Sequence, residues 1–206
     1  MFIIVTGPPG SGKGTQCELI SRELNIPHIS TGFLLNKFLK TKNNYLKSKV
    51  KNNIKKGILV DDSIVINILE KEIFNNKKGF ILDGFPRNYN QVNFLKKKLK
   101  FLFNIIIEIN VPNNILLERI KGRRINKKTG KICNINLKNE TNIKNFTSRL
   151  DDKIDVVKYR IKEYYVNYNI LNKYFKTFIN YFKLDGNKSI IELNKKIIKK
   201  IKNVNI

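Results

Sequence analysis

The chain has 206 residues, of which 41% are hydrophobic, so it can bury the core of one domain and is not globally disordered. Its formal net charge is +25. Lysine and asparagine recur along the whole sequence rather than in one block, which favours a solvated basic surface over a dedicated nucleic-acid or membrane site. The two cysteines, Cys17 and Cys133, lack metal-ligand spacing, which argues against a zinc site and a disulfide framework.

Membrane and targeting signals are not recognised in the sequence. No apolar run approaches membrane-spanning length, and the chain opens on a strand-like run, Phe2 to Val5. We therefore expect neither a membrane partner nor a signal or transit peptide. A cytoplasmic monomer without a specific nucleic-acid partner is the expectation, with a mitochondrial or other organellar matrix left open.

Short apolar runs alternate with segments of helical periodicity. Strands are predicted at 2–6, 28–30, 80–82, 104–109 and 178–184. Helices are predicted at 13–24, 32–42, 62–75, 89–99, 112–121, 151–174 and 188–202. This alternation predicts an α/β fold with a central five-stranded parallel sheet flanked by helices. The polar segment from Ile125 to Phe146 does not fit the pattern and is interpreted as a small inserted flap.

A glycine-rich segment, Gly7 to Thr15, joins the first predicted strand to the first predicted helix. This is the context of a phosphate-binding loop, in which successive backbone N–H groups and the positive end of the helix face phosphate oxygens. Lys13 supplies a full positive charge near the transferred phosphate. Gly14 occupies the position where Ser or Thr is usual, and Thr15 follows it.

A second segment of interest runs from Gly79 to Arg87. In it, an apolar strand ends in Asp83, which is followed by a glycine. In phosphate-binding-loop proteins, an acidic residue at such a strand end holds the water shell of Mg²⁺. The alternative is an ordinary strand-end aspartate. The only histidine, His28, lies in the second predicted strand and is interpreted as a structural residue.

Several motifs together resemble the adenylate kinase family, in family order and over essentially the whole chain. They are Gly7–Gln16, Ile29–Gly32, Leu82–Arg87, Gly122–Arg124, Arg149–Asp152 and Leu184–Gly186. The Gly-Lys-Gly-Thr variant at Gly12–Thr15 is itself usual in that family. The resemblance implies a P-loop NTPase fold, Mg²⁺ with ATP as cofactor, and a nucleoside monophosphate as acceptor.

The arginines support the resemblance independently, because the chain has only seven of them beside 34 lysines. Guanidinium grips phosphate oxygens bidentately and stacks on bases, which ammonium cannot do. Five of the seven fall at family positions: Arg87, Arg119, Arg123, Arg149 and Arg160.

The resemblance assigns roles to individual residues. The implied catalytic set is Lys13, Arg87, Arg123, Arg149 and Arg160. The implied ATP-binding set is Gly10, Ser11, Gly12, Lys13, Gly14, Thr15, Arg119, Arg123 and Lys188. The implied AMP-binding set is Thr31, Asn36, Ile58, Leu59, Val60, Gly84, Phe85, Arg87, Gln91, Arg149 and Arg160. Asp83 would hold Mg²⁺ through water.

The implied organisation is a single domain, 1–206. Its core comprises 1–30, 61–121 and 160–206. A helical insertion for binding the nucleoside monophosphate comprises 31–60, and a small lid comprises 122–159. Without a tetracysteine set, the lid is expected to bind no zinc.

Two positions depart from the family pattern, and both lie in the acceptor half. Phe33 replaces an aspartate associated with the Mg²⁺ water shell, and Asn36 replaces an arginine that grips the acceptor phosphate. Lys37 is adjacent, but neighbouring helical side chains point about 100° apart. These departures predict weaker acceptor binding or altered acceptor choice.

The leading hypothesis is Mg²⁺-dependent phosphoryl transfer from ATP to AMP. GTP:AMP phosphotransfer and UMP/CMP kinase activity are the nearest alternatives. A catalytically weak nucleotide-binding relative also stays open, and so does a basic nucleic-acid binder, although no recognised motif for the last is present.

Overall fold

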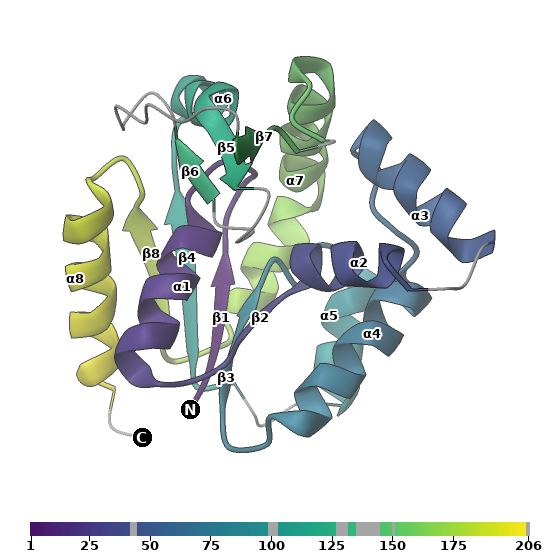
Figure 1. Ribbon diagram of the computed structural model, residues 1–206. Coiled ribbons are helices and arrows are strands. Elements are labelled where there is room, and N and C mark those ends of the chain that lie inside the picture. Colours follow the sequence, from purple (N-terminus) through teal and green to yellow (C-terminus); the bar gives the residue numbers. More distant parts are fainter. Residues whose placement is uncertain (42–44, 99–102, 127–131, 135–144, 150, 205–206) are drawn as a thin grey trace.

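A five-stranded parallel sheet forms the centre of the molecule. The computed structural model describes residues 1–41, 45–98, 103–126, 132–134, 145–149 and 151–204. The strand order is β2-β3-β1-β4-β8 (Figure 1). The strands are β1 (Phe2–Thr6), β2 (His28–Ser30), β3 (Phe80–Asp83), β4 (Ile105–Asn110) and β8 (Tyr181–Asp185). The predicted fold class, an α/β P-loop fold around a five-stranded parallel sheet, is confirmed.

Helices cover both faces of this sheet. They are α1 (Lys13–Leu24), α2 (Thr31–Leu39), α3 (Tyr45–Lys56), α4 (Asp62–Asn75), α5 (Tyr89–Lys98), α6 (Asn113–Gly122), α7 (Ile154–Phe175) and α8 (Ile190–Lys202). Successive residues of β1 face opposite layers: Ile3 packs in the cluster that includes α1 and α8, and Ile4 in the cluster that includes α4, α5 and the end of α7. Because both of their faces are buried, the strands β1, β3 and β4 are almost continuous apolar runs.

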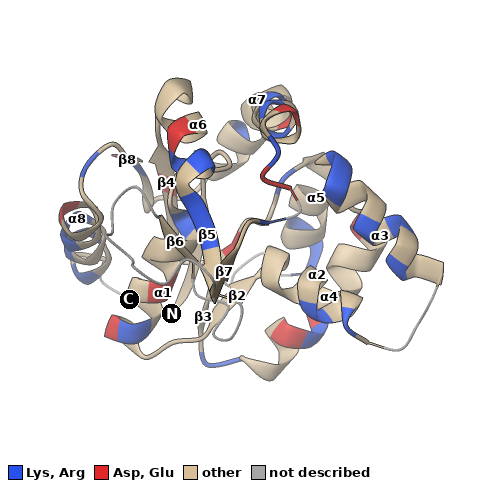
Figure 2. Cartoon of the chain, turned by 45° about the horizontal axis from the view of Figure 1, so that its top comes forward, with Lys and Arg blue, Asp and Glu red and all other residues tan. Residues whose placement is uncertain are grey.

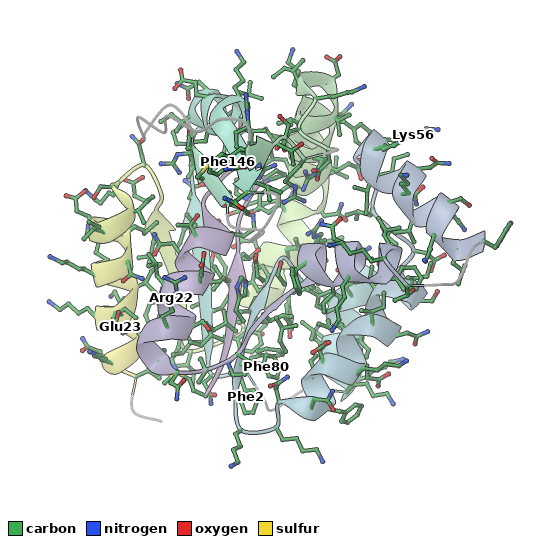
Figure 3. All side chains as sticks on the ribbon, in the orientation of Figure 1. Phe2, Arg22, Glu23, Lys56, Phe80 and Phe146 are labelled. Carbon is green, nitrogen blue, oxygen red and sulfur yellow. The ribbon has the colours of Figure 1, made fainter. Side chains whose placement is uncertain are left out.

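The two ends of the sheet differ in character. At the lower end in Figure 3, the rings of Phe2 and Phe80 meet edge-on with centroids 5.2 Å apart. The carboxyl ends of the parallel strands lie at the opposite end and carry polar residues such as Thr6, Ser30 and Asp83. Ligands of open α/β sheets bind at this carboxyl end, so we expect the site to lie there.

The structure corrects several predicted boundaries. The helix predicted at 32–42 ends at Leu39, and residues 42–44 lie outside the described ranges. The helix α3 was not predicted. The strand predicted at 178–184 begins only at Tyr181, because Phe178 and Ile179 lie in the preceding turn, where Ile179 is almost fully exposed. The helix predicted from residue 151 begins at Ile154.

The segment interpreted as a flap contains a second, small sheet. Its described part comprises β5 (Arg123–Asn126), β6 (Ile132–Asn134) and β7 (Phe146–Thr147), in the antiparallel order β6-β5-β7. Residues 127–131 and 135–144 of the predicted flap lie outside the described ranges. Figure 1 places these strands above the carboxyl ends of the central strands, beside α6 and α7.

Basic residues are spread over the molecule. Figure 2 shows Lys and Arg on α3, α6, α7 and α8, on both sides of the sheet. Within the part of the chain that the structure describes, no helix is both long enough and apolar enough for a bilayer crossing. The distribution agrees with the interpretation of the charge as a general surface property.

Candidate active site

The glycine-rich segment forms a tight loop between β1 and α1. Gly12 precedes the helix with φ of 91°, in the left-handed region that side-chain-bearing residues rarely adopt. The backbone N–H of Ser11 donates to the carbonyl of Pro8 at 3.2 Å and closes the turn. Residues Gly10 to Thr15 therefore lie at the amino end of α1, where backbone N–H groups and the helix dipole favour an anion.

The ammonium group of Lys13 turns back onto this loop. Its Nζ donates to the carbonyl oxygens of Gly7 at 2.8 Å and Pro8 at 2.9 Å. Burial lowers the pKa of Lys13 to about 7, and the nearby Arg87 and Arg160 add to that effect while Asp83 opposes it. A phosphate placed in the loop would favour the charged form of this lysine.

The carboxylate of Asp83 lies beneath the start of α1. A Cβ atom added at Gly14 would be 3.6 Å from Asp83 Oδ2, which shows how closely the strand end approaches the helix. Oδ2 is 3.2 Å from His28 Nε2. Burial raises the pKa of Asp83, but the hydrogen bond with His28 and the charge of Lys13 outweigh burial, and the net shift is downward. Asp83 is therefore ionised at neutral pH.

Three arginines are held by two aspartates that the sequence interpretation left without a role. Arg149 Nε lies 2.9 Å from Asp151 Oδ1, and Arg160 pairs with Asp151 Oδ2. Arg123 Nε lies 3.1 Å from Asp152 Oδ2. The motif Arg149–Asp152 was recognised as a family resemblance, but only the fold shows that its aspartates orient guanidinium groups from β5 and α7.

The charges of this cluster shift one another. Burial raises the pKa of Asp151, whereas Arg149, Arg160 and Arg123 lower it more strongly, so the net pKa lies below its ordinary value. Burial lowers the pKa of Arg160 to about 10, with Asp151 opposing and Arg149 reinforcing the shift. Three arginines beside two aspartates leave an excess of positive charge, which favours the binding of an anion here.

A cavity of about 650 Å³ opens between these groups, a volume within the range of small-molecule sites. Lys13, Arg87, Arg149 and Arg160 all line it. Predicted acceptor residues that line it as well are Thr31, Asn36, Ile58, Leu59, Val60, Gly84 and Gln91. The structure therefore gathers four of the five predicted catalytic side chains around one space, although they come from different segments of the chain.

Arg87 and Gln91 are fixed by hydrogen bonds on the acceptor side. Arg87 Nε donates to the carbonyl of Gly84 at 2.6 Å, and the backbone N–H of Arg87 donates to Gln91 Oε1 at 2.7 Å. Gln91 Nε2 donates to Asp62 Oδ1 at 2.7 Å. Gln91 is buried, which contradicts the alternative of a helix-surface amide. Phe85 packs in the core, so only its backbone can face a ligand.

Phe33 and Asn36, the two residues that depart from the family pattern, both line the cavity, and Phe33 is 67% exposed. Lys37 does not line the cavity; its Nζ lies 3.8 Å from Glu72. Lys40, one helical turn after Asn36, does line it. Lys37 was therefore the wrong candidate to line the cavity beside Asn36; the spacing of four residues on a helix indicates Lys40 instead.

The other predicted donor side chains, Arg119, Arg123 and Lys188, do not line the cavity. Arg119 Nη2 donates to the carbonyl of Gly186 at 2.8 Å, and its Nη1 lies 3.5 Å from the carbonyl of Ser11. Burial lowers the pKa of Arg119, partly opposed by Asp185. Lys188 lies in the turn between β8 and α8. Arg119 thus connects the phosphate-binding loop with the turn after β8.

Comparison with known proteins agrees with this geometry. A family model described as adenylate kinase matches residues 5–180. The chain is 42% identical to the adenylate kinase of Buchnera aphidicola subsp. Cinara cedri (strain Cc), over 100% of this chain and 99% of the relative. It is 39% identical to the adenylate kinase of Buchnera aphidicola subsp. Schizaphis graminum (strain Sg), over 96% of this chain and 98% of the relative. It is 35% identical to the adenylate kinase of Blochmanniella pennsylvanica (strain BPEN), over 95% and 96%. The chain therefore belongs to the adenylate kinase family and is a phosphotransferase.

Proposed function

We propose that this chain catalyses the reversible transfer of a phosphoryl group from ATP to AMP, giving two ADP. The observation that carries the proposal is the single cavity lined by Lys13 of the phosphate-binding loop and by Arg87, Arg149 and Arg160. Relatives named adenylate kinase that match almost the whole chain support it.

The mechanism needs positioning and charge stabilisation rather than a covalent intermediate. In this proposal the amino end of α1 and Lys13 hold the donor phosphates, and Arg119 stacks on the donor base. Arg123, Arg149 and Arg160 neutralise the charge that develops on the transferred group. Arg87 holds the acceptor phosphate, while Thr31, Gln91 and the backbone of Ile58–Val60 surround the acceptor nucleoside.

The residues at the end of β3 fit a magnesium ion that accompanies ATP. An ionised carboxylate, Asp83, lies against the start of α1, and oxygen is the ligand that Mg²⁺ prefers. Bound Mg²⁺ would neutralise charge on the phosphate oxygens, with Asp83 holding its water shell.

We assign the acceptor region to residues 31–60, the lid to 122–159 and the core to 1–30, 61–121 and 160–206. The helices α2 and α3 fall in the first region and the small sheet β6-β5-β7 in the second. Closure of both over the cavity would exclude water, which competes with the acceptor as a nucleophile. The proposed boundary at residue 160 lies inside α7.

A coupled assay tests the proposed function. ATP and GTP are offered as donors against AMP, GMP, UMP and CMP, with Mg²⁺ present. The expected result is the highest kcat/KM for ATP with AMP. GTP as the preferred donor would identify the chain as a GTP:AMP phosphotransferase instead. UMP or CMP as the preferred acceptor would identify it as a UMP/CMP kinase. Triphosphate binding without transfer to any acceptor would contradict catalysis altogether.

The acceptor Michaelis constant depends on which cation replaces the missing arginine at position 36. We predict that Asn36→Arg lowers the KM for AMP by about tenfold or more, since a charge-assisted phosphate contact contributes roughly 1.5–3 kcal/mol.

We predict that Lys40→Met raises the KM for AMP by a similar factor, because Lys40 shares the cavity wall with Asn36. Lys37→Met is the matched control, because Lys37 lies toward Glu72. Steady-state kinetics with varied AMP decide; equal effects of Lys37→Met and Lys40→Met would contradict the assignment.

Proton uptake should accompany triphosphate binding. The pKa of Lys13 is lowered to about 7 in the free protein, and a bound triphosphate raises it. At about pH 8, free Lys13 is mostly neutral and becomes charged on binding, so close to one proton is taken up; at about pH 6 it is already charged and little is taken up. Calorimetric titration with a non-hydrolysable ATP analogue, in buffers of different ionisation enthalpy, measures this number. The uptake should disappear in Lys13→Arg, whose side chain stays charged; unchanged uptake in that variant would assign the proton to another group.

A further inference from the structure

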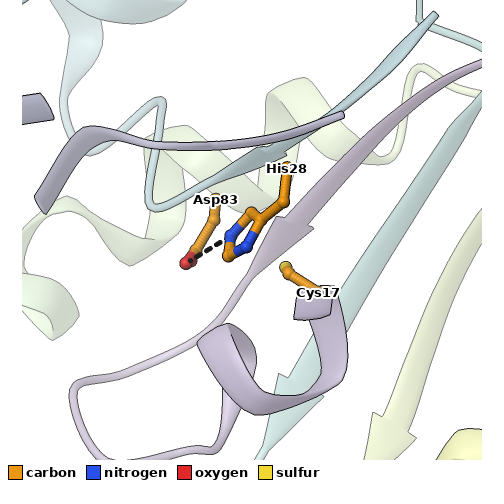
Figure 4. A group of neighbouring side chains, drawn as sticks. All are labelled: Cys17, His28 and Asp83. Atoms are coloured by element: carbon orange, nitrogen blue, oxygen red, sulfur yellow. Dashed lines mark hydrogen bonds and ion pairs between the residues drawn. The ribbon is translucent and has the colours of Figure 1, made fainter. Parts of the chain in front are cut away.

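The fold brings together three metal-ligating side chains that are far apart in the sequence. They are Cys17 on α1, His28 at the start of β2 and Asp83 at the end of β3. Figure 4 shows the imidazole of His28 between the thiol of Cys17 and the carboxylate of Asp83. One ligand atom from each residue lies within 4.8 Å of the other two. The spacing of Cys17 and Cys133 in the sequence argued against a zinc site. The cluster of Cys17, His28 and Asp83 arises from the parallel pairing of β2 with β3 and the packing of α1 on both strands.

The donor set has the chemistry of a zinc site. Thiolate, imidazole and carboxylate are the three protein ligands of Zn²⁺, and a tetrahedral ion holds such atoms about 3.5 Å apart. His28 Nε2 and Asp83 Oδ2 are already 3.2 Å apart, so the main adjustment is a movement of the Cys17 thiol by about 1 Å toward them. Three protein ligands leave the fourth position of the ion to water. We propose that Cys17, His28 and Asp83 form a binding site for one Zn²⁺ ion per chain.

The cluster is accessible to an ion from solvent. Cys17 is fully buried, while the side chains of His28 and Asp83 keep 22% and 11% exposure and so provide a route from solvent. Binding replaces the thiol S–H bond by a Zn–S bond and releases the proton to water. The net charge of the ligand set becomes −2 when the thiol is deprotonated, which matches the charge of the ion.

Zinc at this position would compete with the proposed chemistry. Asp83 is the carboxylate that we assign to the water shell of Mg²⁺, and a direct Zn–O bond removes it from that role. Zinc binding is therefore inhibitory. This consequence rests on the proposed function, whereas binding itself does not.

Metal binding is tested on the purified full chain with Cd²⁺ as the spectroscopic probe and Zn²⁺ as competitor. We expect one Cd²⁺ per chain, a thiolate-to-metal charge-transfer band in the ultraviolet, and loss of that band when Zn²⁺ is added. Cys17→Ala and His28→Gln should each weaken binding by roughly a hundredfold or more, because second-shell changes alone cost about 10- to 100-fold. Cys133→Ser is the matched control, since it removes the other cysteine and should leave the band unchanged.

The results test the metal site and its inhibitory effect separately. A band that persists in Cys17→Ala, or that disappears in Cys133→Ser, overturns the site. Circular dichroism and the thermal midpoint show whether the variants are folded, and agreement between Cys17→Ala and His28→Gln guards against a folding defect in one of them. If Cd²⁺ and Zn²⁺ bind as expected but Zn²⁺ does not inhibit phosphoryl transfer, the site stands and the assigned role of Asp83 is overturned.

Discussion

Substitution Arg160→Lys will lower kcat for phosphoryl transfer by about 100- to 1,000-fold, the cost of removing one preorganised charge-stabilising donor. Arg160 pairs with Asp151 through one arm of its guanidinium and lines the cavity. Lysine keeps the positive charge but loses the planar guanidinium, so it cannot offer Asp151 and a phosphate oxygen two donors in a fixed geometry. Steady-state kinetics with saturating ATP and AMP give the measurement.

A matched arginine is available as the control. Arg22 lies on the outer surface of α1 and pairs with Glu18 at 2.7 Å, with 65% of its side chain exposed (Figure 3). Arg22→Lys should leave kcat unchanged, because an exposed pair one helical turn apart contributes little. Equal kcat values for the Arg160 and Arg22 variants would remove Arg160 from the reaction.

Substitution Asp151→Asn will destabilise the free protein by about 3 kcal/mol or more. Asp151 is 4% exposed and is the shared partner of Arg149 and Arg160, so asparagine keeps its shape but leaves these guanidinium groups without a countercharge. Urea unfolding at neutral pH measures the difference. A bisubstrate analogue that joins two adenosines through a polyphosphate should recover part of the loss, since its phosphates supply the missing negative charge.

The pH dependence identifies the cause of this loss. Because the folded-state pKa of Asp151 is lowered, its stabilisation is fully present above the unfolded pKa of about 4 and is lost as the pH falls through the folded value. The difference between Asp151→Asn and the unsubstituted protein should therefore shrink in acid. Asp155→Asn, also near the start of α7 but exposed, should cost less than about 1 kcal/mol. A pH-independent difference would point to packing instead of charge.

The elements that could be predicted from the sequence are those whose residue pattern lies within one short, continuous stretch of the chain. The phosphate-binding loop needs a strand, a glycine-rich turn and a helix in immediate succession, and α1 begins and ends where it was predicted. The helix α3 was missed because its lysine- and asparagine-rich sequence has only one buried residue, Val50, to mark an inner face. The strands β5, β6 and β7 have at most four residues, too few for an alternating pattern.

The site was predictable where family motifs name residues, and not where partners come from distant segments. Arg149 and Arg160 were predicted, but the burial of Asp151 between them depends on how α7 follows the preceding turn. The contact of Lys37 with Glu72 requires the packing of α2 on α4. The cluster of Cys17, His28 and Asp83 depends on strand order, which single-sequence patterns leave undetermined.

The helix α7 has a consequence for any domain motion. Its last turns carry Leu171, Tyr174 and Phe175, which are buried in the sheet core, and its second turn carries Arg160 in the cavity wall. One continuous helix therefore connects the guanidinium of Arg160 in the cavity wall to the buried core beside the sheet. If the proposed acceptor region and lid close over the cavity, we expect Arg160 to keep its position relative to the sheet, so that the bound nucleotides move toward it.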